Sequence, residues 1–235
     1  MSADGWVILA TDTGVGKTHI GCALLDAARR CNQPLMPLKP VETGCRPVHT
    51  HEQPHTRQPL WPADGAALHQ ACEQAWPLDA ICPLRFATPV AAPEAARLEQ
   101  QALLFQRDLT PLLAQTDNQP RLIETAGGVY SPICEDALNI DIARHTQLPV
   151  LLITPDRLGT LSATLSAMQV ILHQGLTLDR VILNPLPDSN DVFPPDNFSA
   201  LTQWAGQLFP DWDGKIIRFG PENHALDALF LPNQR

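Results

Sequence analysis

The chain has 235 residues, with 25 acidic and 16 basic side chains, a net charge of −9, and only three lysines, Lys17, Lys39 and Lys215. This length suits one α/β domain, and an acidic balance without a basic stripe argues against a nucleic-acid partner. No apolar run reaches the ~18 residues of a membrane span, and the first residues lack the basic start of a secretory signal. We therefore expect a cytoplasmic protein with no membrane partner, whose six cysteines, none in a C-x-x-C pair, are reduced thiols.

Short apolar runs alternate with helical stretches along the chain. The predicted strands cover residues 6–10, 35–39, 121–124, 150–154 and 180–184. The predicted helices cover residues 18–30, 66–75, 93–115, 139–146 and 160–174. Nearly continuous apolar strands are typical of a parallel sheet that is buried on both faces. The alternation therefore predicts one domain over residues 1–235, with a doubly wound, mostly parallel sheet.

Three stretches carry little periodicity. Residues 46–62 are rich in proline and histidine, and we expect an exposed loop there. Its His49, His51 and His55 are either a metal-binding tract or solvated loop residues, and the lack of a well-spaced cysteine or carboxylate favours the latter. Residues 188–196 are predicted to form another loop, and residues 206–235 are only weakly patterned.

The run T-D-T-G-V-G-K-T at residues 11–18 follows an apolar strand and begins a helix. In a phosphate-binding loop, glycines such as Gly14 and Gly16 let backbone N–H groups approach an anion. Lys17 would reach the terminal phosphates, and the Thr18 hydroxyl would bind Mg²⁺. The alternative is a glycine-rich turn without a ligand. The strand–loop–helix context favours the phosphate site, and hence a P-loop NTPase-like three-layer α/β sandwich.

Three charged residues are expected near this loop. Lys39 ends a predicted strand, and the carboxyl ends of parallel strands share one edge of a sheet; the alternative is a surface lysine. Glu124 ends another strand, and Asp64 begins a predicted helix, where it would otherwise be an N-cap. With Thr18, the two carboxylates would complete an oxygen-ligand set for Mg²⁺.

Taken together, the motifs resemble the dethiobiotin synthetase family. The matching runs occur in the family's order over roughly residues 6–185. They are T-D-T-G-V-G-K-T at 11–18, K-P-V-E-T-G at 39–44, the helix start at Asp64, A-T-P-V-A-A-P-E-A-A at 87–96, E-T-A-G-G-V-Y-S-P at 124–132, and D-R-L-G-T-L at 156–161. Ala10 and Thr125 stand where the family usually has glycine, and the loop before Asp64 is longer than usual.

The resemblance implies an ATP- and Mg²⁺-dependent carboxylation and ring closure of 7,8-diaminononanoate with CO₂. The products would be dethiobiotin, ADP and phosphate, formed through a carbamate and a carbamic–phosphoric anhydride. It also implies a homodimer, in which the substrate crosses the interface and its carboxylate meets a helix N-terminus of the partner chain.

The resemblance assigns roles to individual positions. Lys39 and Lys17 would be catalytic, and Thr18, Asp64 and Glu124 would bind the metal. ATP would be bound by Gly14, Val15, Gly16, Lys17, Thr18, His19, Asp64, Glu124, Thr125, Ala126, Gly127 and Asn184. The substrate would be bound by Thr13, Thr43, Gly159, Thr160, Leu161 and Ser162. Thr160 has a second interpretation as a plain N-cap.

Two other functions compete with this one. A cobyrinate amidase-like ligase would carry an added glutamine-hydrolysing domain with a nucleophilic cysteine, for which 235 residues leave no room. A nucleotide switch of the partition type would carry an extra lysine early in the loop, where this chain has Asp12.

Overall fold

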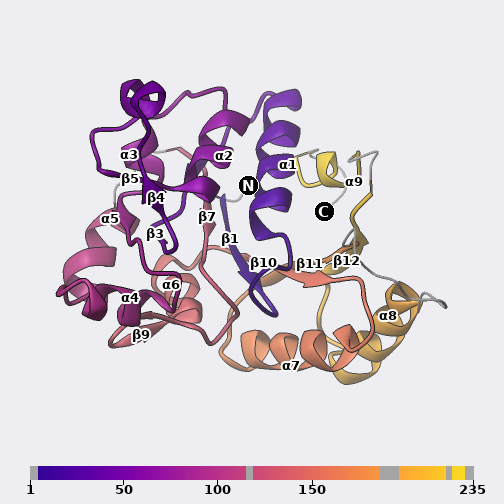
Figure 1. Ribbon diagram of the computed structural model, residues 1–235. Helices are drawn as coiled ribbons and strands as arrows, with labels where there is room; N and C mark the ends of the chain where they lie inside the picture. The colour runs from indigo at the N-terminus through magenta and orange to yellow at the C-terminus, as the bar shows by residue number, and fades with distance from the viewer. Residues whose placement is uncertain (1–4, 115–118, 186–195, 221–223, 231–235) are drawn as a thin grey trace.

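A computed structural model describes residues 5–114, 119–185, 196–220 and 224–230 (Figure 1). Its centre is a six-stranded sheet in the order β12-β11-β10-β1-β7-β2, in which all neighbouring strands are parallel. The strands are β1 (Gly5–Ala10), β2 (Met36–Leu38), β7 (Arg121–Glu124), β10 (Val150–Pro155), β11 (Leu178–Asn184) and β12 (Lys215–Arg218). The predicted doubly wound α/β fold is therefore confirmed.

The central strand β1 explains why helices cover both faces of the sheet. All six of its residues are buried, and alternate side chains enter two separate cores. Val7 and Leu9 pack into the core under α4 (Ala92–Leu98), α6 (Asn139–Thr146), α7 (Thr160–His173) and α8 (Asn197–Leu208). Ile8 and Ala10 face α1 (Lys17–Arg30), α2 (Ala63–Ala71) and α9 (His224–Asp227). Figure 1 shows α1 and α7 on opposite sides of the sheet.

The strand order places the phosphate-loop motif where ligands bind in such folds. From β1 the chain builds β2 and β7 on one side, and then β10, β11 and β12 on the other. The order reverses beside β1, and the crevice at such a reversal, outside the carboxyl ends of the strands, is the usual ligand site. The loop between β1 and α1 lies at this edge.

The helix predicted over residues 93–115 is wrong, because the structure breaks it. Helix α4 ends at Leu98, Gln100 adopts a left-handed conformation with φ of 59°, and a π-helical turn η2 (Phe105–Leu109) leads into α5 (Thr110–Ala114). Distant carboxylates explain the break. Glu99 turns back to accept hydrogen bonds from Thr88, and Asp136 accepts one from the backbone N–H of Phe105.

Residues 46–62 are largely exposed, as expected, but the segment is not a plain loop. Strands β4 (Arg46–Pro47) and β5 (Leu60–Trp61) pair in antiparallel fashion around a 3₁₀ helix η1 (Thr50–His55). The buried Arg85 side chain holds this segment, because it donates to Thr56 Oγ1 and to the Leu60 carbonyl. The three histidines are exposed, and in the described part of the chain no group of three or more His, Cys, Asp or Glu side chains could hold a metal ion.

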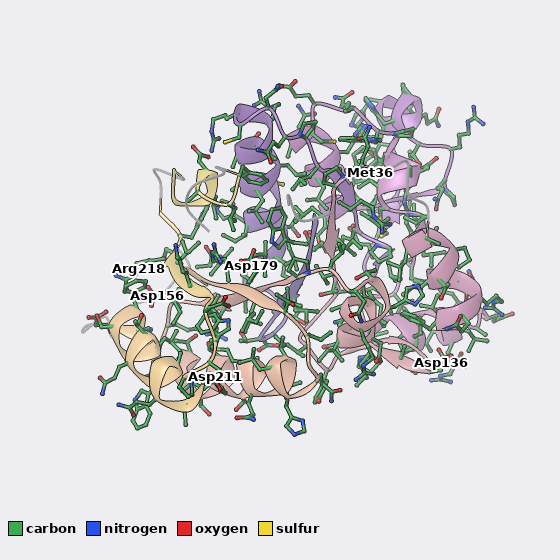
Figure 2. All side chains as sticks on the ribbon, turned by 180° about the vertical axis from the view of Figure 1, so that it is seen from behind. Met36, Asp136, Asp156, Asp179, Asp211 and Arg218 are labelled. Carbon is green, nitrogen blue, oxygen red and sulfur yellow. The ribbon has the colours of Figure 1, made fainter. Side chains whose placement is uncertain are left out.

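The C-terminal third holds elements that the sequence patterns did not reveal. Helix α8 and edge strand β12 follow β11, and Arg218 of β12 donates two hydrogen bonds to Asp156 at the end of β10 (Figure 2). Of the loop predicted at 188–196, residues 188–195 lie outside the described part of the chain, and Asp196 caps α8 by accepting from the Ser199 N–H.

Small elements complete the fold around the site. They are α3 (Leu78–Ile81), the parallel pair β3 (Val41–Glu42) and β6 (Leu84–Arg85), and the antiparallel pair β8 (Pro132–Cys134) and β9 (Ala137–Leu138).

Helix α2 begins three residues before its predicted start. All six cysteines are free thiols. Within the described ranges, no helix has the length and apolar character needed to cross a membrane.

Candidate active site

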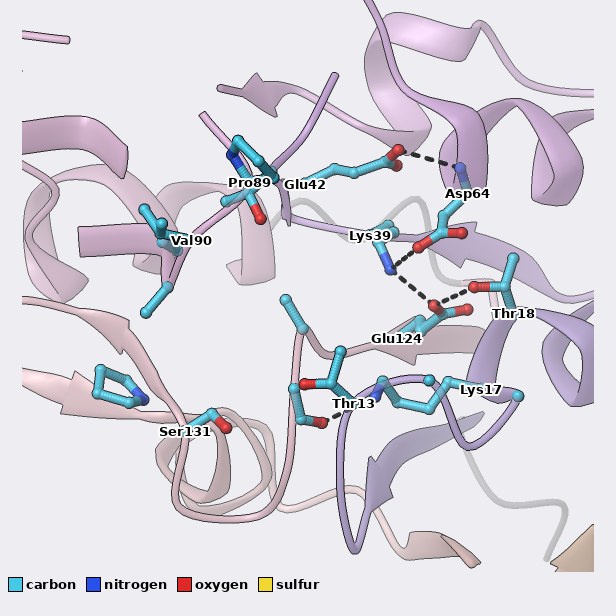
Figure 3. A pocket seen from close by; sticks show the side chains of 18 residues that line it. Thr13, Lys17, Thr18, Lys39, Glu42, Asp64, Pro89, Val90, Glu124 and Ser131 are labelled. Carbon is cyan, nitrogen blue, oxygen red and sulfur yellow. Dashed lines mark hydrogen bonds and ion pairs between the residues drawn. The ribbon is translucent and has the colours of Figure 1, made fainter. Parts of the chain in front are cut away.

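A cleft of about 710 Å³ opens at the carboxyl ends of β1, β2 and β7 (Figure 3). Its walls come from the β1–α1 loop, the residues after β2 and β7, the start of α2, and an apolar ridge before α4. The lining residues are Thr13, Gly14, Gly16, Lys17, Thr18, Lys39, Glu42, Thr43, Asp64, Pro89, Val90, Ala91, Ala92, Glu124, Ala126, Gly127, Ser131 and Pro132. Most of the residues predicted for the site therefore meet in one cavity.

The β1–α1 loop has the backbone of a phosphate cradle. Gly14 and Gly16 have φ values of 71° and 91°, which favour glycine. A Cβ on Gly16 would lie 2.2 Å from Asn184 Nδ2, so a side chain does not fit there. Asn184 itself donates to the Val15 carbonyl at 2.9 Å, which ties the end of β11 to the loop.

Lys17 spans the cleft floor between two loops. Its Nζ donates to the carbonyl oxygens of Gly127, at 2.8 Å, and of Asp12, at 3.3 Å. Burial and then the positive charge of Lys39 lower the pKa of Lys17 to about 8. These two effects outweigh the carboxylates of Glu124, Asp64 and Asp12, which raise the pKa of Lys17, and an anionic ligand would raise it further.

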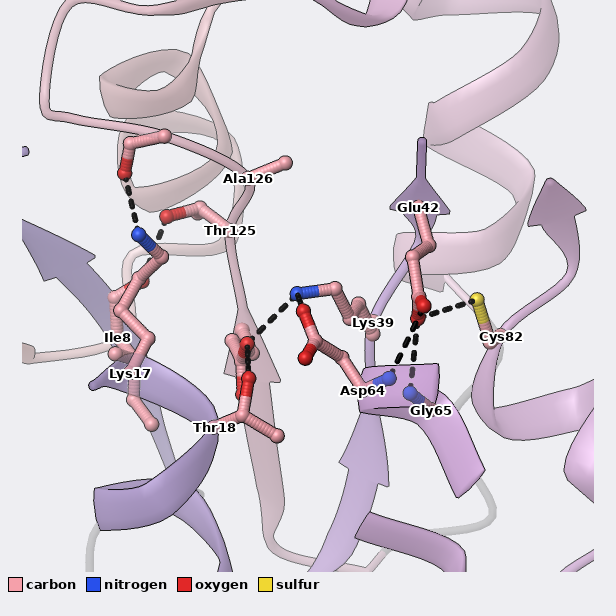
Figure 4. Close-up of polar contacts among 12 residues, drawn as sticks. Ile8, Lys17, Thr18, Lys39, Glu42, Asp64, Gly65, Cys82, Thr125 and Ala126 are labelled. Carbon is pink, nitrogen blue, oxygen red and sulfur yellow. Dashed lines mark hydrogen bonds and ion pairs between the residues drawn. The ribbon is translucent and has the colours of Figure 1, made fainter. Parts of the chain in front are cut away.

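Lys39 lies at the centre of a buried charge cluster (Figures 3 and 4). Its Nζ is 2.7 Å from Glu124 Oε1 and 2.8 Å from Asp64 Oδ2, and the residue is only 3% exposed. Burial pulls the pKa of Lys39 down, but the charges of Glu124 and Asp64 outweigh it and hold that pKa above its ordinary value. The alternative of a surface lysine is therefore wrong.

The carboxylate cluster fits a hard divalent cation. The Thr18 hydroxyl donates to Glu124 Oε1 at 2.7 Å, so a hydroxyl and two carboxylates meet at one point. Glu124 Oε2 is buried and has no hydrogen-bond partner in the described part of the chain. Oxygen ligands of this kind suit Mg²⁺, and an unpartnered buried carboxylate oxygen is a natural ligand atom.

The N-cap interpretation of Asp64 is wrong. The N-cap of α2 is Pro62, and Asp64 is the second residue of the helix, with its carboxylate directed to Lys39. Lys39 outweighs the effect of burial and lowers the pKa of Asp64.

Four residues predicted to bind ATP do not line the cleft: Val15, His19, Thr125 and Asn184. Val15 is buried in the core on the α1 side of the sheet, and the Asn184 amide is bound to the Val15 carbonyl. The Thr125 hydroxyl is fully buried and donates to the Ile8 carbonyl at 2.8 Å. The exposed His19 ring packs edge-to-face on Phe219, with centroids 5.3 Å apart, outside the cleft. The side chains of Thr125 and His19 thus have partners elsewhere, in Ile8 of β1 and in Phe219, which directly follows β12.

The start of α7, at Gly159, Thr160, Leu161 and Ser162, does not line the cleft of the same chain. The Thr160 hydroxyl is buried within hydrogen-bond distance of Thr154 Oγ1, at 2.8 Å. The N-cap of α7 is Gly159, so the interpretation of Thr160 as a plain N-cap is wrong.

Seven residues that line the cleft were not predicted for the site: Glu42, Pro89, Val90, Ala91, Ala92, Ser131 and Pro132. Glu42 is the charged residue among these seven. Glu42 is buried, and its two carboxylate oxygens accept hydrogen bonds from the backbone N–H groups of Asp64 and Gly65. Burial raises the pKa of Glu42. The sequence feature that could have indicated Glu42 is Pro62 at the start of α2, because proline has no side-chain acceptor to cap the helix and a distant residue must do so.

Comparison with known proteins agrees with the presence of a nucleotide-binding site in this cleft. A family model described as an AAA domain matches residues 4–206. An ATP-dependent dethiobiotin synthetase of Anaeromyxobacter sp. (strain Fw109-5) is 33% identical over 86% of this chain and 86% of its own length. The chain belongs to the dethiobiotin synthetase family.

Other dethiobiotin synthetases are similar to this chain over most of its length. The protein of Phenylobacterium zucineum is 36% identical over 78% of this chain and 76% of its own length. That of Rhodopirellula baltica is 31% identical over 86% and 80%. This membership makes the chain an enzyme, an ATP-dependent ligase, and decides against the partition-type switch and the cobyrinate amidase-like ligase.

The lowered pKa of Lys17 predicts how stability depends on pH. Between about pH 8 and the unfolded value near 10.5, the unfolded chain binds more protons, so the free energy of unfolding rises with pH. Relative to Lys17→Met, the wild type should gain up to about 1.4 kcal/mol per pH unit in this window. Urea unfolding of both ligand-free proteins from pH 7 to 10 measures the difference. Parallel pH profiles would show that Lys17 is not perturbed.

Proposed function

We propose that the chain synthesises dethiobiotin by carboxylating 7,8-diaminononanoate with CO₂ and closing the ring, with hydrolysis of ATP to ADP and phosphate. The observation that carries the proposal is the meeting of Lys17 and Lys39 in one cleft beside a phosphate loop. Two of the chain's three lysines serve this single cavity. The six free thiols suit a cytoplasmic enzyme.

The reaction has three steps, in which atoms and charges balance. One amine of the substrate attacks CO₂, forms an N–C bond and loses a proton, which yields a carbamate. A carbamate oxygen then displaces ADP from the γ-phosphorus and forms a carbamic–phosphoric anhydride. The second amine attacks the carbamoyl carbon, phosphate leaves with the C–O bond electrons, and the amine nitrogen loses a proton as the ureido ring closes. None of these steps needs a protein nucleophile, so the site must supply position and positive charge.

The β1–α1 loop and Lys17 would bind the phosphates. Backbone N–H groups around Gly14 and Gly16 suit the oxygens of a polyphosphate, and Lys17 would face its β- and γ-phosphates. Asn184, Ala126 and Gly127 are proposed to border the nucleotide. A Mg²⁺ ion bound by Thr18, Asp64 and Glu124 would neutralise phosphate charge when present.

Lys39 is proposed to stabilise the charge that develops between the carbamate and the transferring phosphoryl group. Its ammonium group is already buried at the cleft floor, where a fixed cation acts more strongly than in water. The cleft-lining Thr13 and Thr43 would hydrogen-bond the carbamate or the diamine. Pro89, Val90 and Ala92 form an apolar wall suited to the methylene chain of the substrate.

We further propose a homodimer in which the start of α7 completes the cleft of the partner chain. The residues concerned lie outside their own chain's cleft, and Leu158 beside them is 79% exposed. The N-terminus of a 14-residue helix is a favourable place for a carboxylate. Gly159, Thr160, Leu161 and Ser162 would then meet the far end of the substrate.

The wild type should convert diaminononanoate, bicarbonate and MgATP into dethiobiotin, detected by mass spectrometry. Lys39→Gln should retain ATP binding but lose turnover by a factor of about 10² to 10³, because one transition-state cation is lost. Calorimetry measures the binding and the product assay measures the rate.

Lys215→Gln is the matched control, since Lys215 is exposed on edge strand β12 and lies outside the cleft. Its turnover should equal that of the wild type. No product from the wild type despite ATP binding would refute the proposed reaction, and near-normal turnover of Lys39→Gln would refute the role of Lys39.

The shared site can be tested by mixing inactive variants. Lys17→Met damages one chain's cleft, and Ser162→Asp places a negative charge where the partner's substrate carboxylate would bind. After exchange, mixed dimers contain one intact site, so about a quarter of wild-type activity should return. Mixing Lys17→Met with Lys39→Gln should restore nothing, because both residues line the same chain's cleft. Equal recovery or no recovery in both mixtures would contradict a site shared in this way.

A further inference from the structure

Glu42 is a buried carboxylate in the cleft wall, next to the charge cluster around Lys39. It ends the short strand β3, whose partner is β6, and it is 5% exposed. Oε1 accepts from the Asp64 N–H at 3.0 Å, and Oε2 accepts from the Gly65 N–H at 2.9 Å (Figure 4). Both oxygens are therefore engaged with the backbone of α2.

These contacts replace a helix cap that the local sequence lacks. The first N–H groups of a helix have no partner within it, and an N-cap side chain normally accepts from the second or third of them. The N-cap of α2 is Pro62, which has no acceptor on its side chain. Glu42, 22 residues upstream of Asp64, supplies both missing bonds.

The capped residue is the one whose carboxylate enters the charge cluster. Asp64 is bound through its N–H to Glu42 and through its Oδ2 to Lys39, at 2.8 Å. The backbone at the next residue, Gly65, packs closely on Cys82, since a Cβ on Gly65 would lie 2.6 Å from the Cβ of Cys82. The first turn of α2 is thus held by Glu42 of β3 and packed against Cys82 at the end of α3, which fixes where the Asp64 carboxylate points.

We propose that Glu42 is a positioning residue that holds Asp64 in place for the bound cation, an inference that rests on the metal-binding role proposed for Asp64. Outer partners of metal ligands typically contribute about 10- to 100-fold to metal affinity or activity. Glu42 would act through Asp64, because its two oxygens bind the backbone N–H groups of Asp64 and Gly65.

The test is the dependence on Mg²⁺. Glu42→Ala should raise the Mg²⁺ concentration for half-maximal turnover about 10- to 100-fold. By calorimetry, its ATP affinity should fall in excess Mg²⁺ but stay close to that of the wild type in a chelator. If Glu42→Ala does not fold, Glu42→Gln keeps the side-chain volume and one acceptor, and should shift the Mg²⁺ dependence in the same direction by a smaller factor.

Asp136→Ala is the matched control. The Asp136 carboxylate, labelled in Figure 2, also accepts from the first turn of a distant helix, at the Phe105 N–H, and it lies outside the cleft. This variant should lose thermal stability, as Glu42→Ala does, without changing the Mg²⁺ dependence.

A local cap should rescue the variant. Pro62 has φ of −87° and ψ of 109°, the extended conformation of an N-cap serine. Pro62→Ser combined with Glu42→Ala should recover most of the lost Mg²⁺ affinity relative to Glu42→Ala alone.

The outcomes separate the inference from the proposed function. A wild type that makes no dethiobiotin refutes the function, whatever the variants do. The positioning role alone is overturned if the wild type makes dethiobiotin and its Mg²⁺ dependence is the same as that of Glu42→Ala, Glu42→Gln and Asp136→Ala. The positioning role is also overturned if Glu42→Ala shifts the Mg²⁺ dependence and Pro62→Ser does not reverse that shift, because Glu42 would then act other than as a helix cap.

Discussion

The Lys39 ammonium group, buried between the carboxylates of Glu124 and Asp64, is the interaction on which the rest of the site depends. A buried ammonium without partners is unfavourable by several kcal/mol, and removing one partner of such a cluster typically costs about 3–5 kcal/mol. The two carboxylates come from different elements, the end of β7 and the first turn of α2. The sheet and α2 must therefore be placed together before Lys39 can be buried.

This cluster also sets the electrostatics around it. The positive charge of Lys39 is the second cause, after burial, of the lowered pKa of Lys17. The same charge favours the ionised form of Asp64 and lowers its pKa. The cleft thus concentrates two lysines and three carboxylates, those of Glu42, Asp64 and Glu124, in a chain whose net charge is −9. A phosphate and a divalent cation are complementary to this arrangement, because each meets the charge that the other leaves unsatisfied.

Sequence patterns predicted the parts of the site that are set by local structure. The strand β1, the loop to α1 and the positions of Lys39 and Glu124 follow from apolar runs that end in charged residues. Long-range contacts decided what the patterns missed. The break after α4 depends on carboxylates such as Asp136, and the cap of α2 is Glu42, which lies on another strand. The inward turn of Thr125 toward Ile8 likewise depends on a neighbouring strand.

The central claim is that Asp64 and Glu124 serve one metal ion while Lys39 serves the phosphate. A crystal structure with Mg²⁺ and a non-hydrolysable ATP analogue tests it most directly. We expect one metal ion bound by Thr18, Asp64 and Glu124, with the Lys39 ammonium facing the γ-phosphate. A metal ion bound elsewhere, with Lys39 still bridging Asp64 and Glu124, would contradict the account.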